Sequence, residues 1–218
     1  IRNLVNTDGG YTSAHALYKA AAPKLDDFFF FNNALDSRPE VYDLARYLFE
    51  KIDYKGNHFL FYKNIHIWED RPDYPLDYSG LMIKYAREHG NVISRDEAIE
   101  YTEYHGSGTP AQTVSLILNR SGWEYFLQYA ENQFVLAEAI HVDDAFKATL
   151  INRIELLLEG EDYVALGDVS DNFYSMLPAM PAGVMWGPLL LESVLERYDI
   201  GFITIDAGEN NDMKTVDA

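Results

Sequence analysis

The six histidines are the first residues to test for metal chemistry, because imidazole is the commonest protein ligand for transition metals. They stand at positions 15, 58, 66, 89, 105 and 141, and no two have the His-x-x-x-His or His-Glu-x-x-His spacing of a helical zinc site. His58 and His66 fall in two segments that we expect to pair as strands, with Glu69 and Asp70 following. Two histidines without a third placed ligand are usually surface groups of a sheet, so the sequence predicts no metal site.

The sequence also lacks a clear motif for a catalytic nucleophile or for an anion-binding site. The glycine-containing segment 105–109 leads into a predicted helix, but it lacks a P-loop lysine and a preceding strand, so we interpret it as an interhelical turn. No Gly-x-Ser-x-Gly elbow occurs. The acidic pairs Asp143-Asp144 and Glu161-Asp162 stand at predicted helix ends, where capping and solvation explain them better than acid/base catalysis. We therefore expect no catalytic residue and no cofactor. An enzyme whose site is assembled from distant carboxylates and histidines is the third alternative.

The basic residues are the next candidates, because lysine and arginine can contact phosphate groups. The chain carries a net charge of −18, and this charge is uneven: residues 1–78 are net −3, residues 79–141 net −4 and residues 142–218 net −11. An acidic surface repels nucleic acid at long range, so an anionic partner would have to use the first third of the chain. The candidates within 37–68 are Arg38, Arg46, Lys51, Lys55 and Lys63. They are mixed with Glu40, Asp43, Glu50 and Asp53, and a solvated face that pairs with its own acids is the alternative.

Aromatic residues supply the candidates for a surface that binds another protein. The chain holds 16 tyrosines, 12 phenylalanines and 3 tryptophans, enough for several cores. Four of them suit an exposed partner surface, since large aromatic side chains dominate binding hot spots: Trp68, Tyr74, Tyr78 and Trp186. The competing interpretation is that these side chains are simply part of the core.

Length and composition limit the class of protein. The 218 residues suffice for one large domain or two to three small ones, and a hydrophobic content of 48% indicates a folded chain. The absence of cysteine excludes a disulfide framework and fits a cytoplasmic protein. No apolar run reaches the roughly 18 residues of a membrane span, and no signal peptide is visible, so we expect no membrane partner. The chain begins with Ile1 and ends in sequence typical of the middle of a strand, so we expect a fragment of a longer protein.

The clearest local pattern lies between Val92 and Ala139. A leading helix is expected over 78–89, with Gly90 after its end. Ser94 begins one helix and Thr109 the next, each with an acid or amide three residues later as in a capping box. Two strands, 125–129 and 133–136, then form a hairpin.

Similar patterns stand before and after this stretch. In the first third we expect a helix over 13–22, capped by Thr12 or Ser13 and interrupted by Pro23. A capping box at 37–40 then starts a helix to Lys51, and strands follow at 58–62 and 65–68. The elements expected in the last third are helix 143–158, strand 163–166, helices 168–176 and 188–198, and a hairpin of 202–205 with 213–216.

These elements repeat one order three times: helix, short strand, helix, helix, hairpin. This order and its capping pattern resemble the winged helix-turn-helix family, in which three helices pack together and a β-hairpin forms the wing. The resemblance implies an α+β fold of tandem winged-helix-like units, each made of helices and a hairpin wing. The predicted domains are 1–78, lacking its first helix, then 79–141, then 142–218, truncated at its end. An ordinary α+β domain with three hairpins is the alternative.

The resemblance also implies where such a protein would contact DNA. In winged-helix proteins the third helix commonly enters the major groove and the wing contacts the backbone. The second copy offers only Arg120 in these elements, and the third only Arg197 and Lys214, although DNA binding needs several phosphate contacts. We therefore expect a non-catalytic protein-interaction or scaffolding module, which binds a protein partner or other domains of the same polypeptide. The alternative is a DNA-binding module that acts through residues 37–68.

Overall fold

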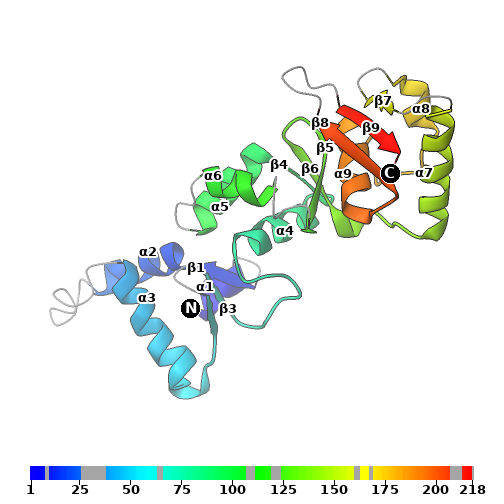
Figure 1. The fold of residues 1–218 in the computed structure, drawn as a ribbon. Coiled ribbons are helices and arrows are strands. Elements are labelled where there is room, and N and C mark those ends of the chain that lie inside the picture. Colours follow the sequence, from blue (N-terminus) through cyan, green and yellow to red (C-terminus); the bar gives the residue numbers. More distant parts are fainter. Residues whose placement is uncertain are drawn as a thin grey trace. The chain divides into compact units, whose positions relative to one another are not determined.

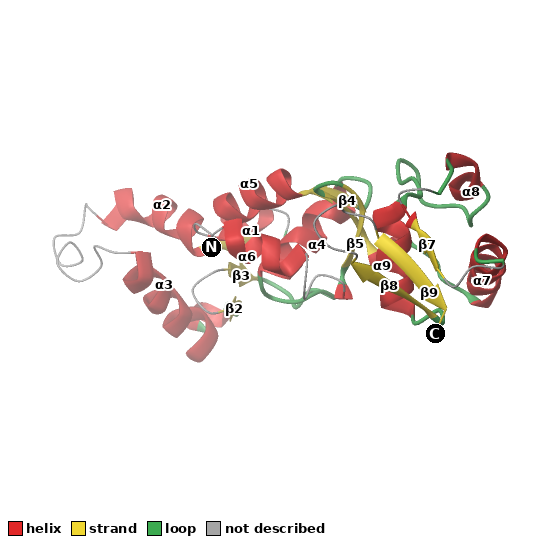
Figure 2. Ribbon diagram, turned by 45° about the horizontal axis from the view of Figure 1, so that its top comes forward, coloured by secondary structure: helices red, strands yellow, loops and turns green. Residues whose placement is uncertain are grey.

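The protein is described by a computed structural model, and its fold is α+β (Figures 1 and 2). The structure describes residues 1–7, 10–25, 38–62, 66–106, 111–118, 124–159, 163–166, 169–206 and 213–217. Within these residues, α-helices alternate with short strands that form three-stranded antiparallel sheets. The α+β fold class predicted from the sequence is confirmed.

The same order of elements occurs three times along the chain. The first set is α1 (Arg2–Thr7), β1 (Tyr11–Ser13), α2 (Ala14–Leu25), α3 (Arg38–Arg46), β2 (Leu60–Tyr62) and β3 (His66–Trp68). The second set is α4 (Tyr78–Glu88), β4 (Val92–Ser94), α5 (Arg95–Gly106), α6 (Ala111–Leu116), β5 (Phe126–Ala130) and β6 (Gln133–Leu136). The third set is α7 (Asp144–Leu157), β7 (Tyr163–Ala165), α8 (Asp171–Ser175), α9 (Pro188–Tyr198), β8 (Phe202–Asp206) and β9 (Met213–Asp217). The predicted repeat of element order is therefore present.

The three sheets also share one strand order, which the sequence did not specify. They read β1-β3-β2, β4-β6-β5 and β7-β9-β8, so the lone strand always pairs with the second strand of the hairpin. The central pairings are Thr12 with Ile67, Ile93 with Phe134 and Val164 with Thr215, all antiparallel. The last hairpin strand is thus the middle strand of each sheet, and its backbone pairs with a strand on either side.

Local capping chemistry accounts for two of the helix starts. The Ser13 hydroxyl accepts a hydrogen bond from the Ala16 amide at 3.0 Å, as a side chain at an N-cap does. The Asp143 carboxylate accepts one from the Phe146 amide at 2.7 Å at the start of α7. Asp143 of the acidic pair is therefore a helix cap, and Asp144 lies in the first turn of α7. The predicted boxes at 37–40 and 109–112 fall partly outside the described residues.

Two expectations for the first set are wrong. The leading helix that we expected to be missing is present as α1, which is only six residues long and buries only Val5, too little to produce an apolar periodicity. Pro23 does not interrupt the second helix, because α2 continues to Leu25 with Pro23 inside it. The lost backbone donor and the ring clash then fall in the final turn, where little helix remains to be broken. Beyond α3 the chain continues as a π-helical turn, Tyr47–Lys51, and a 3₁₀ turn, Tyr54–Gly56.

The chain divides into two compact units whose limits differ from those of the repeats. Unit 1 comprises residues 1–85 and 96–114, and unit 2 comprises residues 86–95 and 115–218. The second repeat therefore gives α5 to unit 1 and its sheet of β4, β6 and β5 to unit 2. The predicted domain limits at 78 and 141 do not coincide with these units.

Each unit has its own hydrophobic core. In unit 1 a first cluster packs Val5, Leu17 and Val41 with Phe59 and Ile67, and a second joins Tyr11, Trp68 and Leu81. The core of unit 2 is larger and mainly aliphatic. It combines the β5–β6 hairpin with α7 and α9, and its fully buried members are Leu127, Val135, Leu150, Ile154, Leu166, Leu190, Leu191 and Val194. Among the described helices we find no stretch with the length and apolar character that a membrane crossing requires.

Candidate functional site

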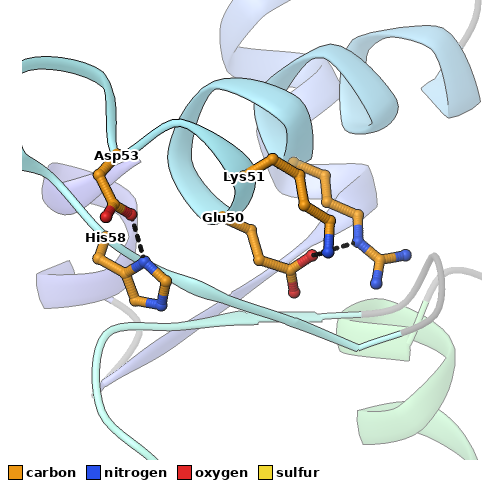
Figure 3. Close-up of polar contacts among 5 residues, drawn as sticks. Glu50, Lys51, Asp53 and His58 are labelled. Atoms are coloured by element: carbon orange, nitrogen blue, oxygen red, sulfur yellow. Dashed lines mark hydrogen bonds and ion pairs between the residues drawn. The ribbon is translucent and has the colours of Figure 1, made fainter.

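The basic residues predicted to contact phosphate lie at the end of α3 and in the turns after it. Arg46 is the last residue of α3 and Lys51 ends the π-helical turn. The Arg46 Nε donates to Glu50 Oε2 at 2.8 Å, and the Lys51 Nζ lies 3.0 Å from the same oxygen (Figure 3). The structure thus brings Arg46 and Lys51 together, but it does so around a shared carboxylate.

The pKa of Glu50 reflects this pairing. Partial burial acts to raise the pKa of the Glu50 carboxyl, but hydrogen bonds from Arg46 and Lys51 outweigh it and hold the pKa below its usual range. The hydrogen bond to Glu50 in turn raises the pKa of the Arg46 guanidinium. The side chain of Glu50 is only 18% exposed, so it faces its cationic partners more than water. Much of the positive potential at this place is therefore compensated by Glu50.

Of the other predicted cations, the structure describes the side chain of Lys55. Lys55 stands at a backbone φ of 56° in the 3₁₀ turn, and its ammonium lies 5.2 Å from the centroid of the Tyr54 ring. On either side of this turn, Asp53 and His58 contact each other, with His58 Nδ1 2.6 Å from Asp53 Oδ1 (Figure 3). Lys63 and the side chain of Arg38 fall outside what the structure describes.

The predicted partner surface contains one clear error. Trp68 is 2% exposed and belongs to the core, so the prediction that it is an exposed binding residue is wrong. The cause is its position on β3, the middle strand of the first sheet, where Tyr11 and Leu60 flank it in register. Tyr74 and Tyr78 are half-buried and pack against the same cluster of Tyr11, Trp68 and Leu81.

The same strand holds a histidine whose environment the sequence did not predict. His66 is fully buried, and neither of its ring nitrogens has a hydrogen-bond partner among the described residues. Aromatic rings surround it: the centroid of Trp68 lies 5.7 Å away, that of Tyr62 6.1 Å and that of Tyr11 6.3 Å. Burial, with a smaller contribution from His105, lowers the pKa of His66 to about 3, so the ring is neutral. Only knowledge that β3 is the middle strand would have identified this residue.

The pairing of His58 and His66 as metal ligands has no support in this geometry. His58 is exposed and contacts Asp53, whereas His66 is enclosed by rings. In the part of the chain that the structure describes, no three histidine or carboxylate side chains are arranged to hold a metal ion.

Trp186, another residue of the predicted partner surface, lines a pocket. It lies in the loop between α8 and α9, where the backbone turns at Pro181 and at Gly183, whose φ of +84° suits glycine. The Trp186 indole donates to the Pro178 carbonyl at 2.6 Å, and its ring lies 6.1 Å from that of Phe146. The indole therefore fixes the loop to the core of unit 2.

The pocket beside Trp186 measures about 510 Å³. Most of the residues that line it are apolar, and the full set is Asp171, Tyr174, Ser175, Leu177, Pro178, Ala179, Met180, Val184, Met185 and Trp186. Met185 is 78% exposed at the rim, and nearby in sequence Met176 is 41% exposed. Burial raises the pKa of Tyr174 to about 12, and its hydroxyl donates to the Leu166 carbonyl at 3.0 Å. The pocket can bind an apolar side chain, and Asp171 and Ser175 add polar groups to its lining.

Comparison with known proteins adds no further assignment. No protein-family model matches the chain, and no curated protein has significant sequence similarity to it.

Proposed function

We propose that the chain is a non-catalytic protein-interaction or scaffolding module built from tandem winged-helix-like units. The repeated strand order supports the winged-helix part of this proposal. In each copy a lone strand precedes the second helix and pairs with the second strand of the hairpin. The proposed partner is another protein or another domain of the same polypeptide.

The observation that carries the interaction role is the apolar pocket beside Trp186. A methionine that is 78% exposed at the rim of a pocket loses favourable burial unless a partner covers it. Methionine is flexible and polarizable, and surfaces that bind other proteins use it often. The Trp186 indole holds the loop in place through Pro178, so the pocket is largely formed before a partner arrives.

The charge distribution favours a protein partner over DNA. Arg46 and Lys51 share Glu50, which compensates the cations that a recognition helix would need. Residues 142–218 are net −11, so the region that carries the apolar pocket repels phosphate. A protein can contact such a surface without this penalty.

Site-specific photo-crosslinking tests the proposal. A benzophenone amino acid replaces Met185 in one variant and Ala148, an exposed residue of α7 in the same unit, in the matched control. We expect a discrete protein adduct from position 185 in an extract of the source cells and none from position 148. Equal adducts from both positions, or none from either, would overturn the proposal.

A gel-shift assay with a 25-base-pair duplex tests the DNA alternative directly. A complex that forms at about 50 mM salt and is lost by about 200 mM would indicate binding through phosphate contacts. That outcome would contradict the proposed function and favour residues 37–68 as a DNA-binding surface.

A further inference from the structure

A second pocket lies in unit 1, in a region that the sequence did not single out. It measures about 330 Å³ and is lined by Tyr85 of α4 and by four residues of α5: Glu97, Glu100, Tyr101 and His105. Spacings of three, four and eight residues place the α5 members on one face of that helix. Both helix segments belong to the same compact unit, so the pocket forms within unit 1.

Aromatic rings form one part of the pocket wall. The centroids of Tyr85 and Tyr101 lie 4.9 Å apart, and those of Tyr101 and His105 lie 4.2 Å apart. The interplanar angles are 56° and 42°, so these rings are tilted and not stacked flat on one another. The face of an aromatic ring carries partial negative charge and attracts cations.

Carboxylates form the other part. The Tyr85 hydroxyl donates to Glu97 Oε1 at 3.2 Å. Burial raises the pKa of Tyr85, and the charges of Glu97 and Glu100 raise it further. Both carboxylates therefore contribute negative potential at the Tyr85 hydroxyl, inside the pocket. None of the five lining residues is a lysine or an arginine.

The aromatic wall rests on the buried cluster of unit 1. The hydroxyls of Tyr101 and Tyr11 are 2.5 Å apart, and the His105 ring lies 5.6 Å from that of Tyr11. Tyr11 is fully buried and packs on Trp68 with centroids 4.7 Å apart. A wall anchored in this way loses little freedom when a ligand binds, which improves affinity.

The same cluster already accommodates a cation. The Lys84 ammonium lies 5.1 Å from the centroid of the Tyr11 ring, and the residue is only 8% exposed. The rings beneath the pocket are therefore compatible with a positive charge close by.

We propose that this pocket binds the cationic end of an arginine or lysine side chain from a partner polypeptide. Aromatic faces and carboxylates together select a guanidinium or ammonium group over a neutral one. A metal ion is a poorer occupant, because no group of three metal-binding side chains occurs among the described residues. The polypeptide source of the cation rests on the proposed function, and the net charge of −18 favours a basic partner.

Titration of the full chain with two short peptides tests this site. The probes are acetyl-Gly-Arg-Gly-amide and the same peptide with citrulline, which keeps the shape of arginine but is neutral. The readout is the ring resonances of ¹³C-labelled tyrosine, assigned with Tyr85→Phe and Tyr101→Phe. We expect saturable shifts of both rings in the millimolar range with arginine, and binding about tenfold weaker or less with citrulline.

Two variants on α5 provide the matched comparison. Both carboxylates are exposed, but Glu100→Gln removes the one that lines the pocket, whereas Glu103→Gln removes one outside it and changes the net charge equally. We expect Glu100→Gln to weaken the arginine peptide about threefold and Glu103→Gln to leave it unchanged. Equal binding of both peptides, equal effects of both variants, or no saturable shift would overturn the proposal. None of these results alters the crosslink expected from position 185, so the two proposals fail separately.

Discussion

The middle of unit 1 and the middle of unit 2 are built from different kinds of side chain. In unit 2, the buried residues of the β5–β6 hairpin, α7 and α9 are mainly aliphatic, and Ser193 on α9 donates to the Gln128 carbonyl at 3.2 Å. In unit 1, the middle strand β3 buries His66 and Trp68, and their ring nitrogens have no hydrogen-bond partner among the described residues. Buried polar atoms without partners cost stability, and proteins retain them mostly where something besides stability is selected.

That difference matches the placement of the two candidate pockets. The pocket in unit 1 lies over polar aromatic groups and carries carboxylates, whereas the pocket in unit 2 lies at a loop fixed by Trp186 and is largely apolar. Repeats with one topology therefore need not share one surface chemistry. A partner contacting both units would need basic and apolar groups.

The largest effect is expected from opening the aliphatic core of unit 2. Leu150 on α7 is fully buried, so Leu150→Ala should reduce the free energy of unfolding of unit 2 by about 2–5 kcal/mol, through lost burial and a cavity. Leu156 on the same helix is 61% exposed, and Leu156→Ala should change it by less than about 0.5 kcal/mol. Hydrogen exchange resolved by mass spectrometry reports each unit separately. Equal loss of protection in unit 1 would mean that the two units unfold as one, and our contrast between them would fail.

A smaller, pH-dependent effect is expected from the polar core of unit 1. The pKa of His66 is lowered by burial to about 3, well below that of an unfolded histidine near 6.5. The unfolded state therefore binds more protons between these values, so stability is complete above pH 6.5 and is lost as the pH falls towards 3. Relative to His66→Phe, the native chain should lose about 1.4 kcal/mol of unfolding free energy per pH unit in this window.

The comparison with His66→Phe removes the contribution of carboxylates, which titrate in both proteins. At pH 7 the variant should be as stable as the native chain or more so, because an apolar ring replaces an unpartnered polar one. Urea titrations at several pH values from 7 to 4 measure the difference. Parallel pH profiles for the two proteins would show that His66 is not held neutral by burial.

The parts of this structure that sequence reasoning predicted are those determined by local chemistry. The hydroxyl of Ser13 and the carboxylate of Asp143 cap their helices as expected, because capping involves residues three positions apart. The order of helices and hairpins follows from apolar periodicity and turn residues in the same way. α1 was missed because six residues with one buried side chain carry almost no pattern.

The errors concern contacts between distant segments. The burial of Trp68 and His66 depends on β1 pairing with β3 from more than 50 residues away, which no local pattern encodes. The contribution of the second repeat to both units likewise depends on packing, as when α9 packs against β5. The sequence shows that the predicted cations lie among acidic residues, but the sharing of Glu50 by Arg46 and Lys51 required coordinates.

We expect the smallest effect at the carboxylate of Glu50, which Arg46 and Lys51 share. A small effect there would distinguish the charged edge of unit 1 from its core. Glu50→Gln removes one ion-pair partner from both Arg46 and Lys51, whose side chains are 39% and 60% exposed. Exposed ion pairs contribute little, so unit 1 should lose at most about 1 kcal/mol, and less at high salt. Because the pKa of Glu50 is lowered in the folded state, this contribution is present above the pKa of an unfolded glutamate and disappears as the pH falls.

The same variant also tests why this surface should not bind DNA. Arg46 and Lys51 lose their shared counter-charge in Glu50→Gln, but two cations supply fewer phosphate contacts than DNA binding normally requires. We therefore expect no DNA complex from either protein in a gel shift at about 150 mM salt. If Glu50→Gln bound DNA and the native chain did not, Glu50 alone would be preventing the interaction. The edge of unit 1 would then be a masked nucleic-acid surface, and our account of its charge would have to change.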